Sequence, residues 1–161
     1  MNSEQYLLHA VQENFDGKVY VRPTIPDKIL VNSALKVASG IDTSLIIACV
    51  DVSLLGDGKE GLVFSGDTIY LHESLSDFDN VVIPLADLTA TEYDENSTTD
   101  EHGKVHVVKR LTVTYANEDP LVIESENIRT SLKSLGRVIQ GLAENVEKIQ
   151  STAQDMQLKD F

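Results

Sequence analysis

The sequence predicts an α+β protein with two N-terminal helices, seven short strands and a long C-terminal helix. Apolar residues recur at helical spacing near both ends of the chain. Between Gly40 and Ser125, short runs rich in Val, Ile, Leu, Thr and Tyr alternate with turn-forming Gly, Pro, Asn and Asp. The chain has 161 residues, 42% of them hydrophobic, which suffices for one buried core without a disulfide.

Two short helices are expected before Gly40. The apolar residues of the first share one helical face: Leu7, Leu8, Val11 and Phe15. Gly17 is placed to end that helix, and Pro26 suits the first turn of a second helix that runs to about Ser39. The domain prediction is therefore an N-terminal helical extension over residues 1–40 and a main unit over residues 41–161.

The middle of the chain has the composition of short strands joined by tight turns. The segment from Ser44 to Leu55 is rich in Ile, Val and Leu, and Lys104 to Tyr115 alternates apolar and polar residues. Asn117 to Pro120 has the composition of a turn. The seven predicted strands are 45–53, 61–65, 68–73, 81–84, 88–93, 104–115 and 120–124.

The last segment shows the clearest periodicity, with apolar residues at alternating steps of three and four. They are Ile128, Leu132, Leu135, Ile139, Leu142, Val146, Ile149, Ala153 and Met156. A helix is expected from about 125–127 to residue 150 or beyond, too long for one small body to cover. The first half should pack on the protein itself. For the distal half, with Val146, Ile149 and Met156 as candidate interaction residues, both the N-terminal helices and a second subunit remain open.

Charge is concentrated in one part of the chain. From Asp42 to Glu101 there are 14 acidic residues and one basic residue, Lys59, and the whole chain carries −13. This charge disfavours binding to nucleic acid and to anionic membranes. Residues 92–101 are expected to form a mobile acidic loop, either a solvated surface or one that attracts a basic protein segment or cations. Its candidate interaction residues are Glu92, Asp94, Glu95, Asp100 and Glu101.

The sequence favours a cytoplasmic location and offers no support for catalysis. The N-terminal residues lack the pattern of a secretion signal, and Cys49 lies in an apolar strand where a thiol is normally inert. Gly56, Gly58 and Gly61 fit G-x-G-x-x-G, but a strand follows, which favours a hairpin turn over a nucleotide site. No catalytic residue and no cofactor is therefore expected.

The histidines near the acidic segment raise two alternatives. His102 and His106 would share one face of a strand and approach a metal together with Glu101. Lys104 lies between them and opposes metal binding. Pairing of the histidines with an acid of the neighbouring strand, such as Glu92, is therefore favoured, and no metal site is predicted.

Residues 55–73 (LGDGKEGLVFSGDTIYLHE) and 82–88 (VIPLADL) resemble bacterial PH-like domains of the pleckstrin-homology superfold. The resemblance implies a seven-stranded bent barrel of two nearly orthogonal sheets, closed at one end by the C-terminal helix. The two N-terminal helices would then be an extension. Phosphoinositide-binding members carry a basic loop at the position of Gly56 to Gly61, where this chain has a single Lys between acids, so lipid binding is not expected.

The function expected from these observations is a non-enzymatic intracellular PH-like module for protein–protein interaction or self-association, including a homodimer through the C-terminal helix. A small acidic secretion-type chaperone that holds a partner segment is the alternative. A helix in the middle of the strand region would favour the chaperone, and residues 43–124 show no helical period.

Overall fold

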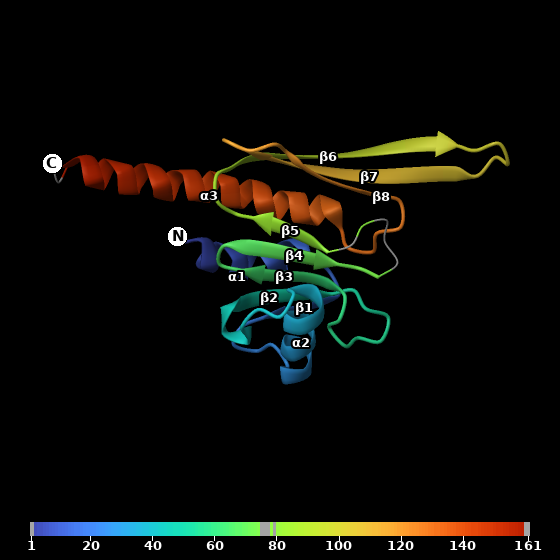
Figure 1. Cartoon of the computed structure of the whole chain (residues 1–161), viewed down its shortest axis with the longest axis horizontal. Helices are drawn as coiled ribbons and strands as arrows, with labels where there is room; N and C mark the ends of the chain where they lie inside the picture. Colours follow the sequence, from blue (N-terminus) through green and yellow to red (C-terminus); the bar gives the residue numbers. More distant parts are fainter. Residues whose placement is uncertain (1, 75–77, 79, 160–161) are drawn as a thin grey trace.

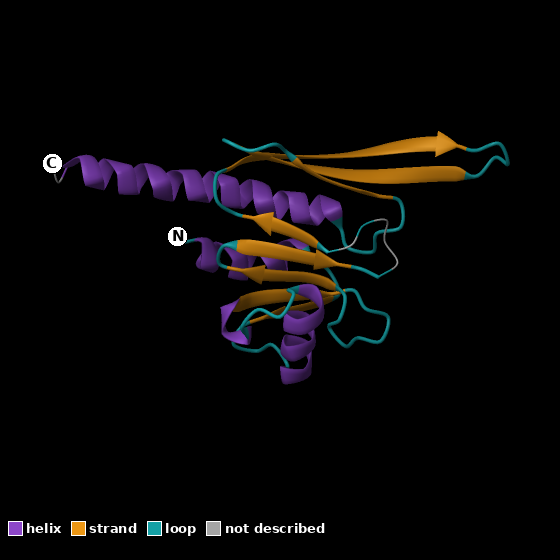
Figure 2. Ribbon diagram, in the orientation of Figure 1, coloured by secondary structure: helices purple, strands orange, loops and turns teal. Residues whose placement is uncertain are grey.

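The computed structural model describes residues 2–74, 78 and 80–159, with side chains up to residue 145. Within these residues, three α-helices accompany two antiparallel sheets (Figure 1, Figure 2). The elements are α1 (Ser3–Asn14), β1 (Lys18–Val21), α2 (Asp27–Asn32), β2 (Ile46–Asp51), β3 (Gly61–Ser65), β4 (Thr68–His72), β5 (Val81–Pro84), β6 (Leu88–Thr99), β7 (Val105–Tyr115), β8 (Leu121–Ser125) and α3 (Leu132–Lys159). Short turns of π-helix (Ser33–Val37) and 3-10 helix (Thr43–Leu45) precede β2.

All seven predicted strand positions are confirmed, but the closed seven-stranded barrel is wrong. The strands form a five-stranded sheet in the order β1-β2-β3-β4-β5 and a separate three-stranded sheet, β6-β7-β8. Among the described residues, no strand pairing joins the two sheets. Two helices prevent closure: α3 contacts β6 and β7, while α1 contacts α3 on one side and β1 and β2 on the other. The two sheets are therefore joined by helices that pack in one shared core, and not by hydrogen bonds between their strands.

The five-stranded sheet is covered on both faces, which explains its nearly continuous apolar strands. Every residue of β2 and β3 is buried. One face, with Leu62 and Phe64, belongs to the core shared with α1 and α3. The other face, with Cys49 and Val63, packs under α2 and the π-helical turn. Burial raises the pKa of the Cys49 thiol to about 11, as expected for a thiol in an apolar strand.

The N-terminal forty residues contain a strand that the sequence analysis did not predict. β1 pairs antiparallel with β2 and forms one edge of the five-stranded sheet. Both predicted N-terminal helices are present. Asn2 and Gln5 form a capping box at the start of α1. The second predicted helix is α2, which ends at Asn32 and is followed directly by a π-helical turn that ends at Val37.

The prediction of a loop over residues 92–101 is wrong, because β6 continues to Thr99 and pairs with β7 along its length. Acidic residues are poor strand formers, but Asp94 lies opposite Arg110 and Glu95 opposite Lys109. β8 reaches only as far as Lys109 on β7. Beyond that point the sheet is a two-stranded ribbon that projects from the body (Figure 1).

The long helix begins at Leu132, later than the predicted 125–127. Ser131 caps it by accepting the Ser134 amide at 3.1 Å, and the residues just before Ser131 are held in a non-helical link by Glu73. The predicted stripe is buried as far as it is described: Ile128, Leu132, Leu135, Ile139 and Leu142. A Cβ at Gly141 would overlap the Tyr6 hydroxyl, so this glycine permits the contact between α1 and α3.

The distal candidates Val146, Ile149 and Met156 lie within α3, but their side chains fall outside the described residues. Packing of this stripe on the N-terminal helices or on a second subunit stays a prediction. Figure 1 shows the C-terminal half of α3 extending past both sheets. No described helix is both long enough and apolar enough to cross a membrane.

Candidate functional site

The outer edge of β6 carries main-chain groups that none of the described strands pairs. The Thr91 amide donates to Gln140 Oε1 of α3 at 2.9 Å, so this amide points away from β7. At the hairpin end, the Asp100 amide donates to the Lys104 carbonyl at 2.9 Å. In an antiparallel pair, the even-numbered residues of β6 therefore direct their main-chain groups toward β7, and the odd-numbered residues direct theirs outward. The register is regular from Ala90 to Thr99. The amides facing outward therefore include those of Tyr93, Glu95, Ser97 and Thr99, which we call the β6 edge.

A groove lies between the start of the β6 edge and α3. Its volume is about 500 Å³, and its lining residues are Thr91, Tyr93, Lys133, Gly136, Arg137, Gln140, Gly141 and Glu144. A Cβ at Gly136 would press on Leu111, so this glycine allows α3 to pack closely on β7 beside the groove. Gln140 occupies the position that a carbonyl of an additional strand would take at Thr91.

The structure distributes the predicted acidic residues along this ribbon rather than gathering them into one cluster. Glu92, Asp94 and Glu95 lie on β6 and are exposed. Asp100 and Glu101 lie in the turn between β6 and β7. Side chains of adjacent residues on a strand point to opposite faces, so Glu95 shares a face with Tyr93, whose hydroxyl donates to its carboxylate at 2.6 Å.

His106 connects the ribbon to the link before α3. Its Nε2 lies 2.9 Å from Asp100 Oδ2, and its Nδ1 lies 2.5 Å from Glu126 Oε1. These acids, rather than the predicted Glu92, are its partners. The hydrogen bond with Asp100 and then that with Glu126 raise the pKa of His106, because only the protonated ring can donate to both carboxylates. His102 is largely exposed and lies near Glu101.

The order of the ribbon should depend on pH through His106. A raised pKa means that its contacts contribute fully below about pH 6.5 and are lost as the pH rises through the raised value. The pKa of Asp100 is lowered, chiefly by the hydrogen bond with His106, so its contribution is complete above the ordinary value of 3.8 and is lost as the pH falls from there through the lowered value. We expect amide exchange of residues 104–108, corrected for intrinsic rates, to be slower at mildly acidic than at alkaline pH. His106→Asn should abolish the difference, and His102→Asn should keep it; equal behaviour of the two variants would contradict the prediction.

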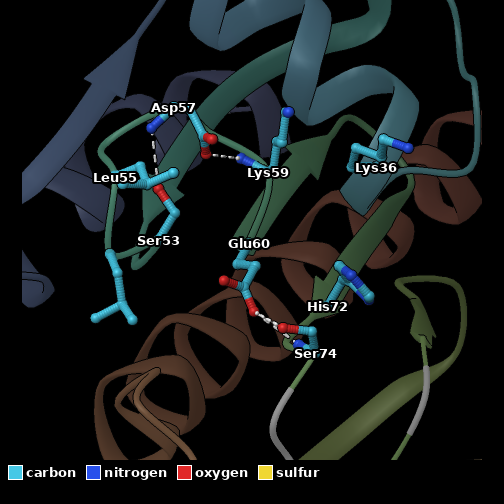
Figure 3. Close-up of a pocket in the computed structure, with 9 residues that line it drawn as sticks. Lys36, Ser53, Leu55, Asp57, Lys59, Glu60, His72 and Ser74 are labelled. Carbon is cyan, nitrogen blue, oxygen red and sulfur yellow. Dashed lines mark hydrogen bonds between the residues drawn. The ribbon is translucent and has the colours of Figure 1, made fainter.

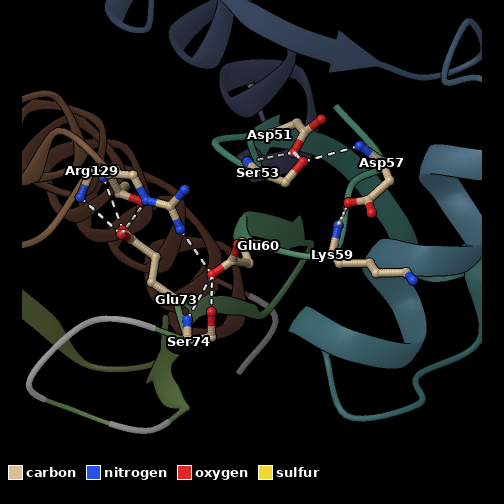
Figure 4. A network of polar contacts seen from close by, with 9 residues as sticks. Asp51, Ser53, Asp57, Lys59, Glu60, Glu73, Ser74 and Arg129 are labelled. Carbon is tan, nitrogen blue, oxygen red and sulfur yellow. Dashed lines mark hydrogen bonds and ion pairs between the residues drawn. The ribbon is translucent and has the colours of Figure 1, made fainter. Parts of the chain in front are cut away.

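A second polar arrangement joins the β2–β3 loop to the link before α3 (Figure 4). Glu73 is buried and accepts the main-chain amides of Arg129 and Thr130 at 2.8 and 2.9 Å. Arg129 Nη2 lies 2.9 Å from Glu60, which also accepts from the amide and hydroxyl of Ser74. Burial alone would raise the pKa of Glu60, but the hydrogen bonds from Ser74 and Arg129 outweigh it and lower the pKa.

The β2–β3 loop lines a pocket of about 380 Å³ (Figure 3). Its lining residues are Lys36, Ser53, Leu54, Leu55, Asp57, Lys59, Glu60, His72 and Ser74. This loop was predicted to be a hairpin turn, and the antiparallel pairing of β2 with β3 confirms that. The pocket itself was not predicted. Two leucines placed between the end of a strand and a Gly-Asp-Gly turn were the available signal.

No match to this chain was found among protein-family models, curated proteins or solved structures. The resemblance to bacterial PH-like domains therefore stays a prediction, while the closed barrel that it implied is wrong. Within the described residues, no three His, Cys, Asp or Glu side chains gather as a metal site would require. Two candidate surfaces formed by the described residues are the β6 edge with its groove and the loop pocket.

Proposed function

We propose that this chain is a non-enzymatic protein-binding module that takes an extended, basic segment of a partner as an additional strand on the β6 edge. The observation that carries the proposal is the main-chain amide of Thr91, at the start of the long edge strand β6. This amide points away from β7, and its partner is a side chain, that of Gln140, in place of another strand. An exposed edge of this length is a template for another strand, and proteins that do not use such an edge usually cover it.

Charge indicates the kind of segment. The part of the chain that includes β6 has 14 acidic residues and one basic residue between Asp42 and Glu101. Long-range attraction brings basic segments to such a surface and repels acidic ones. Lysine side chains of an added strand would lie close to Glu95 on one face of the ribbon or to Glu92 and Asp94 on the other.

The chaperone alternative receives less support. A chaperone of that class would interrupt its strands with a helix, and the described residues between β2 and β8 contain no helix. Self-association through the distal part of α3 is compatible with strand addition, because the two surfaces lie on different elements (Figure 1).

Peptide binding tests the proposal directly. We expect a labelled ten-residue peptide of alternating threonine and lysine to bind with an affinity that falls as salt is added. Ser97→Pro removes one outward amide and leaves the β6–β7 ladder intact, so it should weaken binding by about tenfold, the loss expected for one edge hydrogen bond and the strand geometry around it. Fluorescence anisotropy measures both affinities.

Ser97→Ala is the matched control, because it removes the same side chain and keeps the amide. It should bind like the wild type, and thermal melting should show that both variants are folded. Equal affinity of the proline and alanine variants would contradict strand addition. Binding of a threonine–glutamate peptide as tightly as the lysine peptide, or no binding of the lysine peptide at millimolar concentration, would contradict the basic partner.

A further inference from the structure

The β2–β3 loop holds two leucines in water on an ordered framework. Leu54 is 81% and Leu55 is 87% exposed, the highest values among the large apolar side chains that the structure describes. Such a placement loses the stabilisation that burial would give, and a loop without other constraints could turn these side chains inward. The loop around them is constrained by many hydrogen bonds.

These hydrogen bonds begin at the end of β2 and reach the neighbouring helix (Figure 4). Asp51 Oδ1 accepts from the amide and hydroxyl of Ser53, whose hydroxyl oxygen accepts from the Asp57 amide. Ser33 donates its hydroxyl to the Gly58 carbonyl, and the Asn32 side chain donates to the Asp57 carbonyl. The loop is thus tied to β2 and to α2, and the leucines are displayed by a preformed structure.

The pocket beside the leucines has cationic groups at its rim. Lys36 and Lys59 form no ion pair among the described residues. Two acids also line the pocket. Glu60 is engaged by Ser74 and Arg129, and Asp57 accepts the Lys59 amide, which is the main cause of its lowered pKa. Although the whole chain carries a net charge of −13, a negatively charged group in this pocket would lie near two lysines.

A buried, unpaired atom lies in the wall of the same pocket. His72 Nδ1 is shielded from water and has no hydrogen-bond partner among the described residues. Buried polar atoms of this kind are normally satisfied, so this nitrogen is an exception, and its shielding also keeps it out of direct contact with a molecule in the pocket. In Figure 3, the His72 side chain lies between Lys36 and Ser74.

We infer that the loop pocket binds a carboxylate that is joined to an apolar group of about one side chain in size. The carboxylate pairs with Lys36 and Lys59, which both line the pocket. The apolar group packs on Leu54 and Leu55. A C-terminal leucine of a peptide and a short fatty acid both have this chemistry. The pocket's volume is within the range of small-ligand sites.

Two probes, N-acetyl-leucine and octanoate, test the inference with N-acetyl-leucinamide as the uncharged control. We expect both acids to shift the NMR amide signals of residues 53–60, and the tighter of the two assigns the source as a peptide end or a fatty acid. The amide should bind at least about tenfold more weakly, because it cannot pair with the lysines. An amide as effective as the acid, or no shift with either acid at millimolar concentration, would overturn the inference.

Variants locate the binding. Lys36→Met with Lys59→Met should weaken the binding of the acids by at least about tenfold, whereas Lys28→Met, on α2 but outside the pocket lining, should leave it unchanged. Leu54→Ser with Leu55→Ser should also weaken it, and these exposed positions allow substitution without loss of the fold. If the lysine pair and the Lys28 variant behave alike, the acids bind elsewhere and the inference fails.

Discussion

Gly61→Ala should strongly destabilise the protein, although Gly61 would first be considered for a phosphate-binding motif. Gly61 has φ +131°, and a Cβ there would overlap the carbonyl oxygen of Val50 on the paired strand. The backbone conformation costs an L-residue roughly 1–2 kcal/mol, and relief of the overlap adds roughly 1–3. We expect a loss of about 3 kcal/mol or more in the free energy of unfolding, measured by urea denaturation.

Gly66→Ala is the control for this substitution. Gly66 lies in the turn between β3 and β4, and a Cβ there would meet nothing within 4 Å. The free energy of unfolding of the Gly66→Ala variant should stay within about 0.5 kcal/mol of the wild-type value. If Gly61→Ala were as stable as Gly66→Ala, close approach of β2 and β3 at this point would not be the reason for the glycine.

Glu73→Ala should be the most damaging substitution of a charged residue. The side chain is 1% exposed, and it accepts the amides of Arg129 and Thr130 at the link that leads into α3. Its removal leaves these two amides without their buried acceptor and takes from the Arg129 guanidinium one of its two carboxylates, so that only Glu60 remains. Breaking a buried charge network in this way costs about 3–5 kcal/mol, so we expect a large fall in the melting temperature.

Glu124→Ala is the matched control, because it also removes a carboxylate that pairs with an arginine. Glu124 lies 2.8 Å from Arg110, but its side chain is 46% exposed. An exposed pair of this kind contributes about 1 kcal/mol or less. Similar losses for the two variants would show that Glu73 does not organise the link. Circular dichroism melts of both variants make the comparison.

Local patterns in the sequence sufficed for most elements. The apolar runs of β2 and β3, the alternation of β7 and the stripe from Leu132 to Leu142 each depend on nearby residues, and all are found where they were predicted. β6 was predicted too short, because its acids disfavour a strand unless basic residues lie opposite. Asp94 and Glu95 meet Arg110 and Lys109 only after the hairpin has formed.

The candidate sites depended even more on contacts between distant segments. The acidic residues of 92–101 were visible in the sequence, but the groove beside them requires α3 to place Gln140 at Thr91, 49 residues away. The loop pocket combines Lys36, the β2–β3 loop and His72 from β4. Neither combination leaves a pattern at a fixed spacing, so neither was predicted.

The sequence by itself determined the positions of seven of the eight described strands, the buried face of the long helix and the acidic character of the chain, because these follow from local periodicity and composition. Only the tertiary structure decided that the strands form two sheets instead of a closed barrel. That outcome depends on α1 and α3 packing between the sheets, with Gly141 allowing α3 to approach Tyr6. Burial of the helical stripe against both sheets is a contact between segments far apart in the chain, and no local pattern specifies which surface such a stripe will cover.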